Sequence, residues 1–84
     1  MASATLTLIG KPGCHLCDDA REVITGVVSD FAGVSLDELS ILDDRELYAK
    51  YMDEIPVLLL NGKVHNIWRI DPARLRAALT EATA

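Results

Sequence analysis

Hydrophobic and polar positions change their period several times along the chain, and each change predicts a new element. Thr5 to Ile9 alternates threonine with aliphatic residues and leads into a turn containing glycine and proline, which predicts a β-strand. From residue 16 the apolar positions recur with the period of a helix, at Leu16, Ala20, Val23, Ile24, Val27, Val28 and Phe31. Because polar side chains occupy the opposite face, we expect an amphipathic helix that ends before Gly33.

The middle of the chain predicts a second strand and a short helix. The strand is expected over Val34 to Ile41, where a change in the parity of the apolar positions indicates a bulge or an early end. Asp43 followed by Glu46 matches a helix capping box and places the start of the helix there. The expected buried side of this helix consists of Leu47, Tyr48, Tyr51 and Met52.

The last third of the chain predicts a hairpin and a final helix. Ile55 to Leu60 is continuously apolar, as in a strand covered on both faces, and Asn61-Gly62 is a strong signal for a tight turn. Lys63 to Ile67 is the expected partner strand. Asp71-Pro72 suits the cap and first turn of a helix whose inward face holds Leu75, Ala78, Leu79 and Ala82. The predicted order is βαβαββα, an α/β fold with a four-stranded mixed sheet flanked by three helices.

Composition and charge narrow the possible functions. A chain of 84 residues, half of them apolar, suits one domain spanning residues 1–84 rather than two. The formal net charge is -5 and lysine and arginine form no run, so we expect binding to neither nucleic acid nor an anionic membrane. Met1 to Ala4 carries no basic segment followed by a long apolar stretch. We therefore expect a soluble, cytoplasmic protein that works as a monomer.

The only two cysteines, Cys14 and Cys17, lie three positions apart. A bond between them would restrain little of the unfolded chain, so a purely structural disulfide is not expected. A lone CxxC motif in a cytoplasmic chain is typical of redox chemistry or of half a metal site. A metal site needs further ligands, and the chain offers His15 and His65 but no second CxxC. Both interpretations stay open, with redox chemistry favoured.

The predicted helix gives the two sulfurs different surroundings. Cys14 precedes the helix, whereas Cys17 lies at the edge of the apolar stripe, so one sulfur is exposed and the other sheltered. Backbone N–H groups at the helix start favour the Cys14 thiolate, and Lys11 and a protonated His15 add favourable charge. We predict that the pKa of Cys14 is below that of a free cysteine, that Cys14 attacks a disulfide, and that Cys17 resolves the product. Ordinary solvated roles for Lys11 and His15 remain alternatives.

With these elements in place, the sequence resembles the glutaredoxin-like branch of the thioredoxin superfamily over nearly its whole length. Lys11 to Asp18 looks like the active-site segment of short bacterial glutaredoxin-like proteins with a CHLC centre, and Glu46 to Tyr51 with Ile55 to Leu58 looks like their middle segment. The resemblance implies a minimal thioredoxin or glutaredoxin fold and a small thiol-disulfide oxidoreductase. It also implies a cis peptide bond between Ile55 and Pro56, beside the CxxC, where the backbone pairs with an extended substrate.

The chain departs from true glutaredoxins at two places that bear on the substrate. His15 stands where they have proline, and Asn66-Ile67-Trp68-Arg69 stands where they have a glycine pair that helps to seat glutathione. The expected substrate-binding residues are Ile55, Pro56, Trp68 and Arg69. We expect no bound cofactor, a disulfide-containing protein or low-molecular-weight thiol as substrate, and glutathione, another such thiol or a thioredoxin reductase as reductant.

Plainer roles stand beside these predictions. Trp68 could cap the core beneath the last helix, Arg69 could be solvated, and His65 suits an ordinary edge position. A thioredoxin-fold interaction module without turnover is a further alternative, because a fold alone does not guarantee activity.

Overall fold

The computed structural model describes residues 3–84, and its elements follow the predicted order βαβαββα. They are β1 (Ala4–Gly10), α1 (His15–Val28), β2 (Val34–Ser40), α2 (Arg45–Tyr51), β3 (Val57–Leu60), β4 (Lys63–Ile67) and α3 (Pro72–Ala82). The strands form one sheet in the order β2-β1-β3-β4. Because β2 runs parallel to β1 while β3 runs antiparallel to β1 and β4, the predicted mixed sheet is confirmed.

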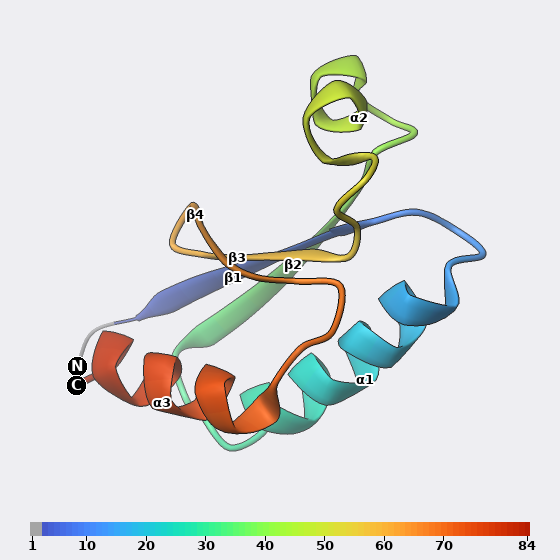
Figure 1. Cartoon of the computed structure of the whole chain (residues 1–84). Coiled ribbons are helices and arrows are strands. Elements are labelled where there is room, and N and C mark those ends of the chain that lie inside the picture. Colours follow the sequence, from blue (N-terminus) through green and yellow to red (C-terminus); the bar gives the residue numbers. More distant parts are fainter. Residues whose placement is uncertain (1–2) are drawn as a thin grey trace.

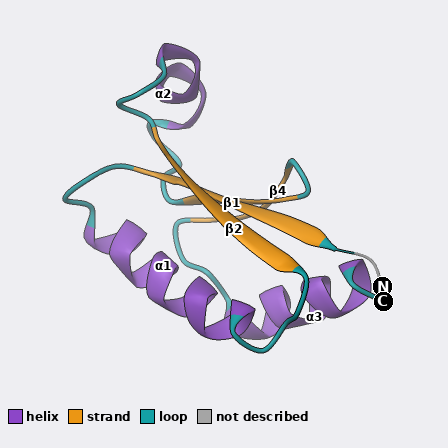
Figure 2. Ribbon diagram, turned by 180° about the vertical axis from the view of Figure 1, so that it is seen from behind, coloured by secondary structure: helices purple, strands orange, loops and turns teal. Residues whose placement is uncertain are grey.

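The main core lies between the sheet and two helices. α1 and α3 lie side by side on one face of the sheet, and α2 lies on the other side, beyond one end of the strands (Figures 1 and 2). The aliphatic side chains of this core that are buried almost completely include Leu6, Leu8, Ile24, Leu58, Leu75 and Leu79. Burying each such side chain stabilises the fold by about 1.5–3 kcal/mol, so this layer anchors α1 and α3 against the sheet.

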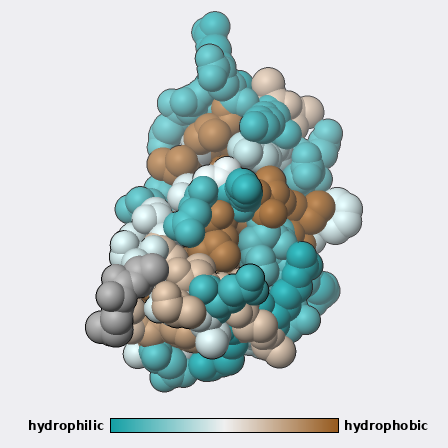
Figure 3. All heavy atoms as spheres, turned by 90° about the vertical axis from the view of Figure 1, so that its left-hand side faces the viewer, coloured by the Kyte–Doolittle hydropathy of each residue, from teal (hydrophilic) through white to brown (hydrophobic). Residues whose placement is uncertain are grey.

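A smaller core lies on the opposite face of the sheet. Its buried members are Ile9, Ile41, Tyr51 and Val57. The expectation that Tyr48 and Met52 are buried is wrong, since their exposed fractions are 47% and 46%. The reason is that α2 has only two turns and directs Tyr51 and part of Leu47 toward the sheet. Other apolar side chains also reach the surface, and Figure 3 shows brown hydrophobic patches among teal hydrophilic atoms on one face.

The parity change in β2 marks an early end of the strand and not a bulge. β2 ends at Ser40 instead of Ile41, and its pairing with β1 is regular throughout. Leu39, on the side of the strand away from α1, is 46% exposed, which accounts for the broken alternation. The irregularity in this sheet lies between Leu58 and Leu59, where the β3–β4 register shifts.

The β3–β4 hairpin agrees closely with the one predicted from the sequence. β3 begins at Val57 instead of Ile55, directly after Pro56, which has no N–H to donate to a neighbouring strand. Asn61 and Gly62 have φ values of 51° and 86°, the left-handed backbone that a tight two-residue hairpin requires. The predicted turn and β4 are therefore confirmed.

The helix ends depend on side-chain caps. Asp44, not Asp43, caps α2, because its carboxylate accepts hydrogen bonds from the N–H groups of Glu46 and Leu47, the second and third residues of the helix. Asp71 caps α3 and Pro72 occupies its first turn, as predicted. α1 ends at Val28, earlier than the apolar stripe, and Phe31 packs against the main core from the following turn. No helix within residues 3–84 is long and apolar enough to cross a membrane.

Candidate active site

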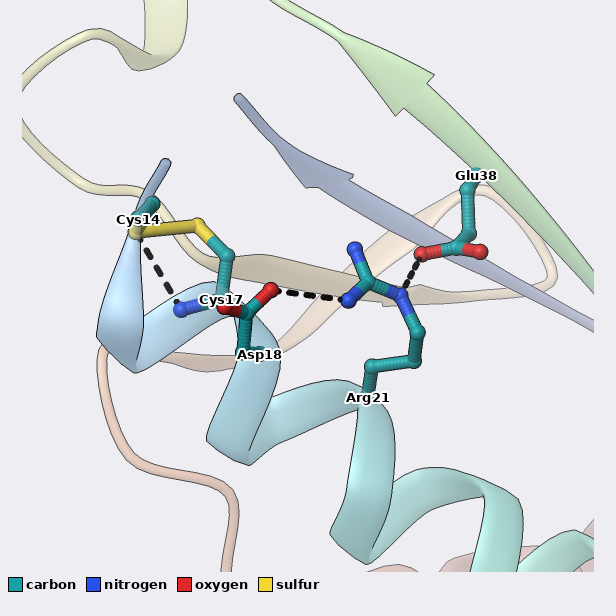
Figure 4. The surroundings of a disulfide bond; sticks show 5 residues. All are labelled: Cys14, Cys17, Asp18, Arg21 and Glu38. Carbon is teal, nitrogen blue, oxygen red and sulfur yellow. Dashed lines mark hydrogen bonds and ion pairs between the residues drawn. A yellow bond between two sulfur atoms is a disulfide. The ribbon is translucent and has the colours of Figure 1, made fainter. Parts of the chain in front are cut away.

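Cys14 and Cys17 lie at the start of α1, where the chain arrives from β1 through a short turn. Their sulfurs are joined as a disulfide, with 5.2 Å between the two Cα atoms (Figure 4). Cys14 is the N-cap of α1, and its Sγ accepts a hydrogen bond from the backbone N–H of Cys17 at 3.2 Å. After reduction, the same donor and the positive end of the helix would stabilise a thiolate on Cys14.

The two cysteines differ in exposure, as the sequence predicts. Cys17 is 1% exposed, whereas Cys14 is partly exposed. Cys17 sits tightly against the end of β1, since a Cβ atom added at Gly10 would lie 2.8 Å from its Sγ and 3.2 Å from its Cβ. Sequence reasoning identified Gly10 only as the end of a strand, because a contact across seven residues leaves no periodic signal. The absence of a side chain at Gly10 is what makes room for the Cys17 sulfur.

A cavity of about 300 Å³ opens beside Cys17. Its polar lining includes Arg21, which pairs with Asp18 at 2.9 Å and with Glu38 across from α1 to β2 (Figure 4). The hydrogen bond and charge of Glu38, followed by those of Asp18, raise the pKa of Arg21. Lys11 also lines this cavity and is exposed. The Arg21–Glu38 pair was not predicted from the sequence, because only the fold brings these two residues together.

Trp68 is hydrogen-bonded to the segment before β3. Its backbone N–H donates to the Pro56 carbonyl at 2.8 Å, and its indole Nε1–H donates to the Asp53 carbonyl at 3.3 Å. The peptide bond between Ile55 and Pro56 is cis, as the family resemblance implies. A second cavity, of about 120 Å³, is lined by Trp68, Arg69 and the CxxC residue Leu16. With 53% of its surface exposed, Trp68 does not cap the core.

The two histidines are placed differently. His15 is exposed as the first residue of α1. His65 lies on the edge strand β4 and is partly buried, and its Nε2 has no hydrogen-bond partner. Burial, with a smaller contribution from the charge of Arg74, lowers the pKa of His65. Across residues 3–84, no three His, Cys, Asp or Glu side chains are grouped so that they could hold a metal ion.

Comparison with known proteins identifies the family. Residues 5–80 match the model of the glutaredoxin-like domain (DUF836). The chain belongs to the glutaredoxin-like family. This glutaredoxin-like protein is 36% identical to the structural genomics target XcR50 from X. campestris, with a TM-score of 0.72 over 92% of this chain and 97% of that one. The resemblance noted in the sequence is confirmed.

Further relatives and structural neighbours are also similar to this chain. The uncharacterized protein Rv0508 from Mycobacterium tuberculosis (strain ATCC 25618 / H37Rv) is 29% identical over 87 residues, which cover 99% of this chain and 90% of the relative. The glutaredoxin-like protein YDR286C homolog from Dictyostelium discoideum is 28% identical over 78 residues, covering 87% and 72% of the two chains. A mutant thioredoxin from Halobacterium salinarum NRC-1 shares the fold, with 15% identity and a TM-score of 0.72 over 99% and 77%. The glutaredoxin-like protein therefore has the thioredoxin fold with a CxxC pair at its helix start.

Proposed function

We propose that this glutaredoxin-like protein is a dithiol thiol-disulfide oxidoreductase in which Cys14 attacks and Cys17 resolves. The observation that supports this most directly is the different setting of the two bonded sulfurs. Cys14 is partly exposed at a helix N-terminus and accepts a backbone N–H, whereas Cys17 is 1% exposed. A nucleophile needs access and a stabilised thiolate, and a resolving thiol needs only to reach its neighbour.

The proposed cycle moves two electrons from the protein to the substrate. The Cys14 thiolate attacks one sulfur of a substrate disulfide, forms a mixed disulfide and releases the other sulfur as a thiolate. Cys17, after losing its proton, attacks Cys14 Sγ and releases the second substrate sulfur. The Cys14–Cys17 disulfide that results is the form in the structure. An external thiol or dithiol returns the two electrons and restores both thiols.

The remaining site residues have supporting roles in this proposal. Lys11 and His15 tune Cys14 from the turn before it and the first helical turn, while Ile55, Pro56, Trp68 and Arg69 bind the substrate. The reductant is glutathione, another low-molecular-weight thiol or a thioredoxin reductase, and the substrate is a protein disulfide or a small one. We place this reaction in the cytoplasm, because a lone CxxC suits a reducing compartment. In this proposal the glutaredoxin-like domain works as a monomer and holds no resident cofactor.

Two cysteine variants test the proposal. Cys17→Ser should accumulate a covalent mixed disulfide at Cys14 when mixed with a disulfide substrate, because the resolving thiol is absent. Cys14→Ser should form none and should turn over no faster than uncatalysed exchange. Intact-mass spectrometry reads the adduct, and thermal unfolding checks that both variants fold. If Cys14→Ser is as active as the unmodified protein, the assignment is wrong, and if neither the unmodified protein nor Cys17→Ser reacts, a non-catalytic module is the better interpretation.

A further inference from the structure

The backbone of Trp68 adopts a conformation that bulky residues rarely adopt. Its φ is 63°, in the left-handed region, where a large side chain is strained. Two hydrogen bonds, to the Pro56 and Asp53 carbonyls, hold this conformation in place. The strain does not serve to bury the ring, which is 53% exposed. Glycine would satisfy the same backbone at no cost, so the indole itself needs an explanation outside the core.

Trp68 lines a small cavity together with Leu16, the residue that follows His15 in the CxxC motif. Trp68 and Ile70, on the segment before α3, line this cavity together with Leu16, Ala20 and Val23 of α1. Leu16 stands between the two cysteines and is 38% exposed. The cavity, of about 120 Å³, has room for one apolar side chain next to Leu16. A free small thiol has no such side chain next to its sulfur, but a polypeptide does.

The cavity lining holds one carboxylate, Asp19, and one cation, Arg69. The charge that a substrate meets on approach is therefore set by the protein as a whole. The whole chain carries a formal net charge of -5. Glutathione disulfide is anionic at neutral pH, so the net negative charge of the protein disfavours its approach. A segment with neutral or basic residues beside its cysteine meets complementary charge.

We propose that Trp68 is the specificity-determining residue of this site and selects extended polypeptide disulfides over glutathione disulfide. The preferred substrate carries an apolar residue beside the reacting cysteine, which enters the cavity between Trp68 and Leu16, and neutral or basic residues around it. Asp19 at the cavity and the net negative charge of the chain supply the charge discrimination. This inference rests on the oxidoreductase function proposed above and names the class of its substrate.

The test compares probes that differ in one property at a time. The probes are short peptide disulfides with Leu next to the cysteine and flanking Lys, the same peptides with flanking Glu, glutathione disulfide, and the small neutral hydroxyethyl disulfide. The measured quantity is kcat/KM for each probe relative to hydroxyethyl disulfide. The unmodified protein should prefer the Lys-flanked peptide over glutathione disulfide, and the preference over the Glu-flanked peptide should shrink as salt is added, because screening weakens charge effects.

The Trp68→Gly variant isolates the indole. Glycine keeps the backbone N–H that bonds Pro56 and removes the strain, so the fold should be retained, and thermal unfolding verifies this. The relative kcat/KM for the Leu-containing peptide should fall about tenfold, the effect of losing one apolar contact in a pocket. Val64→Thr, at an exposed position on β4, is the control variant. Its kcat/KM for the Leu-containing peptide relative to hydroxyethyl disulfide should equal that of the unmodified protein. Asp19→Asn should raise the relative rate with glutathione disulfide.

The outcomes separate this inference from the function on which it rests. If Trp68→Gly keeps the preference, or if the unmodified protein prefers glutathione disulfide, the role assigned to Trp68 is wrong while Cys14-dependent turnover still supports an oxidoreductase. Equal rates with the Lys-flanked and Glu-flanked peptides at low salt would show that charge does not contribute to substrate selection. Failure of every probe to react through Cys14 would overturn the proposed function and this inference together.

Discussion

The two sides of the Cys14–Cys17 disulfide are built differently. On the Cys14 side the sulfur is partly exposed, and Leu16, two residues further on, lines a cavity together with the strained, half-exposed Trp68. On the Cys17 side the sulfur is buried against Gly10, and the nearby cavity carries ion-paired side chains centred on Arg21. Two identical residue types one helical turn apart thus differ in access, packing and charge. Their different chemical roles follow from these surroundings and not from the cysteines themselves.

The largest expected contrast between the two sides is in thiol reactivity. In the reduced protein, iodoacetamide should modify Cys14 at least about tenfold faster than Cys17, because alkylation requires an accessible thiolate. Peptide mass spectrometry over a time course measures both rates in one sample. The difference should vanish in concentrated urea, where both cysteines are exposed. Equal rates in the folded protein would show that the two sides are not distinct in solution.

Packing on the Cys17 side can be broken with one methyl group. Gly10→Ala places a Cβ 2.8 Å from Cys17 Sγ, so the sulfur or β1 must shift, and overpacking of this kind costs about 1–3 kcal/mol of unfolding free energy. Urea denaturation of the oxidised protein measures the loss. Gly26→Ala is the matched control, since a Cβ there meets nothing within 4 Å and Gly26 lies inside α1. The control should stabilise the protein by roughly 0.5–1 kcal/mol, and an unchanged Gly10→Ala would contradict the tight fit.

A smaller effect is expected from the ion pairs beside Cys17. Arg21→Gln should lower the unfolding free energy by less than about 1 kcal/mol, with the loss fading in salt, because both pairs are exposed. Arg76→Gln, which breaks an exposed pair with Asp30 of 2.8 Å, should have a similar effect on stability. Only Arg21→Gln should also slow the resolving step, since it removes a cation from the cavity that holds Cys17. If the two variants release the substrate thiol at the same rate, Arg21 does not assist the resolving step.

The smallest expected effect is on the pH dependence of the unfolding free energy and comes from His65, which lies on neither side of the disulfide. Burial lowers the pKa of His65, so the unfolded chain takes up a proton more readily than the folded one below the ordinary value of 6.5. The unfolding free energy should therefore be highest above pH 6.5 and fall as the pH is lowered. His65→Gln should flatten this dependence, and His15→Gln, at an exposed position, serves as the control. An unchanged profile in His65→Gln would show that another group is responsible.

Much of the fold could be predicted from local signals. The strand and helix periods, the Asn61-Gly62 turn and the Asp71-Pro72 helix start all act within a few residues, and each is confirmed. Local signals were insufficient where neighbouring residues compete for the same structural position. Two aspartates in a row offered two caps for α2, and the apolar residues of this short helix outnumber the positions that can face the sheet.

The site was predictable as a motif but not as a set of contacts. The exposed and sheltered positions of Cys14 and Cys17 follow from the helical period, and the cis bond at Pro56 follows from the family resemblance. By contrast, the fit of Gly10 against Cys17 and the left-handed backbone of Trp68 depend on segments that only the folded chain brings together. No periodicity in the sequence encodes them.

Trp68 is the only tryptophan in the chain. Trp68 is 53% exposed and lines a cavity with Leu16 of the CxxC motif, so the tryptophan emission of the protein comes from one place, at the proposed substrate contact. Desolvation of the ring by a bound peptide, or a change in quenching between disulfide and dithiol, alters the emission of that single fluorophore. The protein thus contains its own optical probe, and substrate docking and the redox state of Cys14 and Cys17 can be followed in real time without a label.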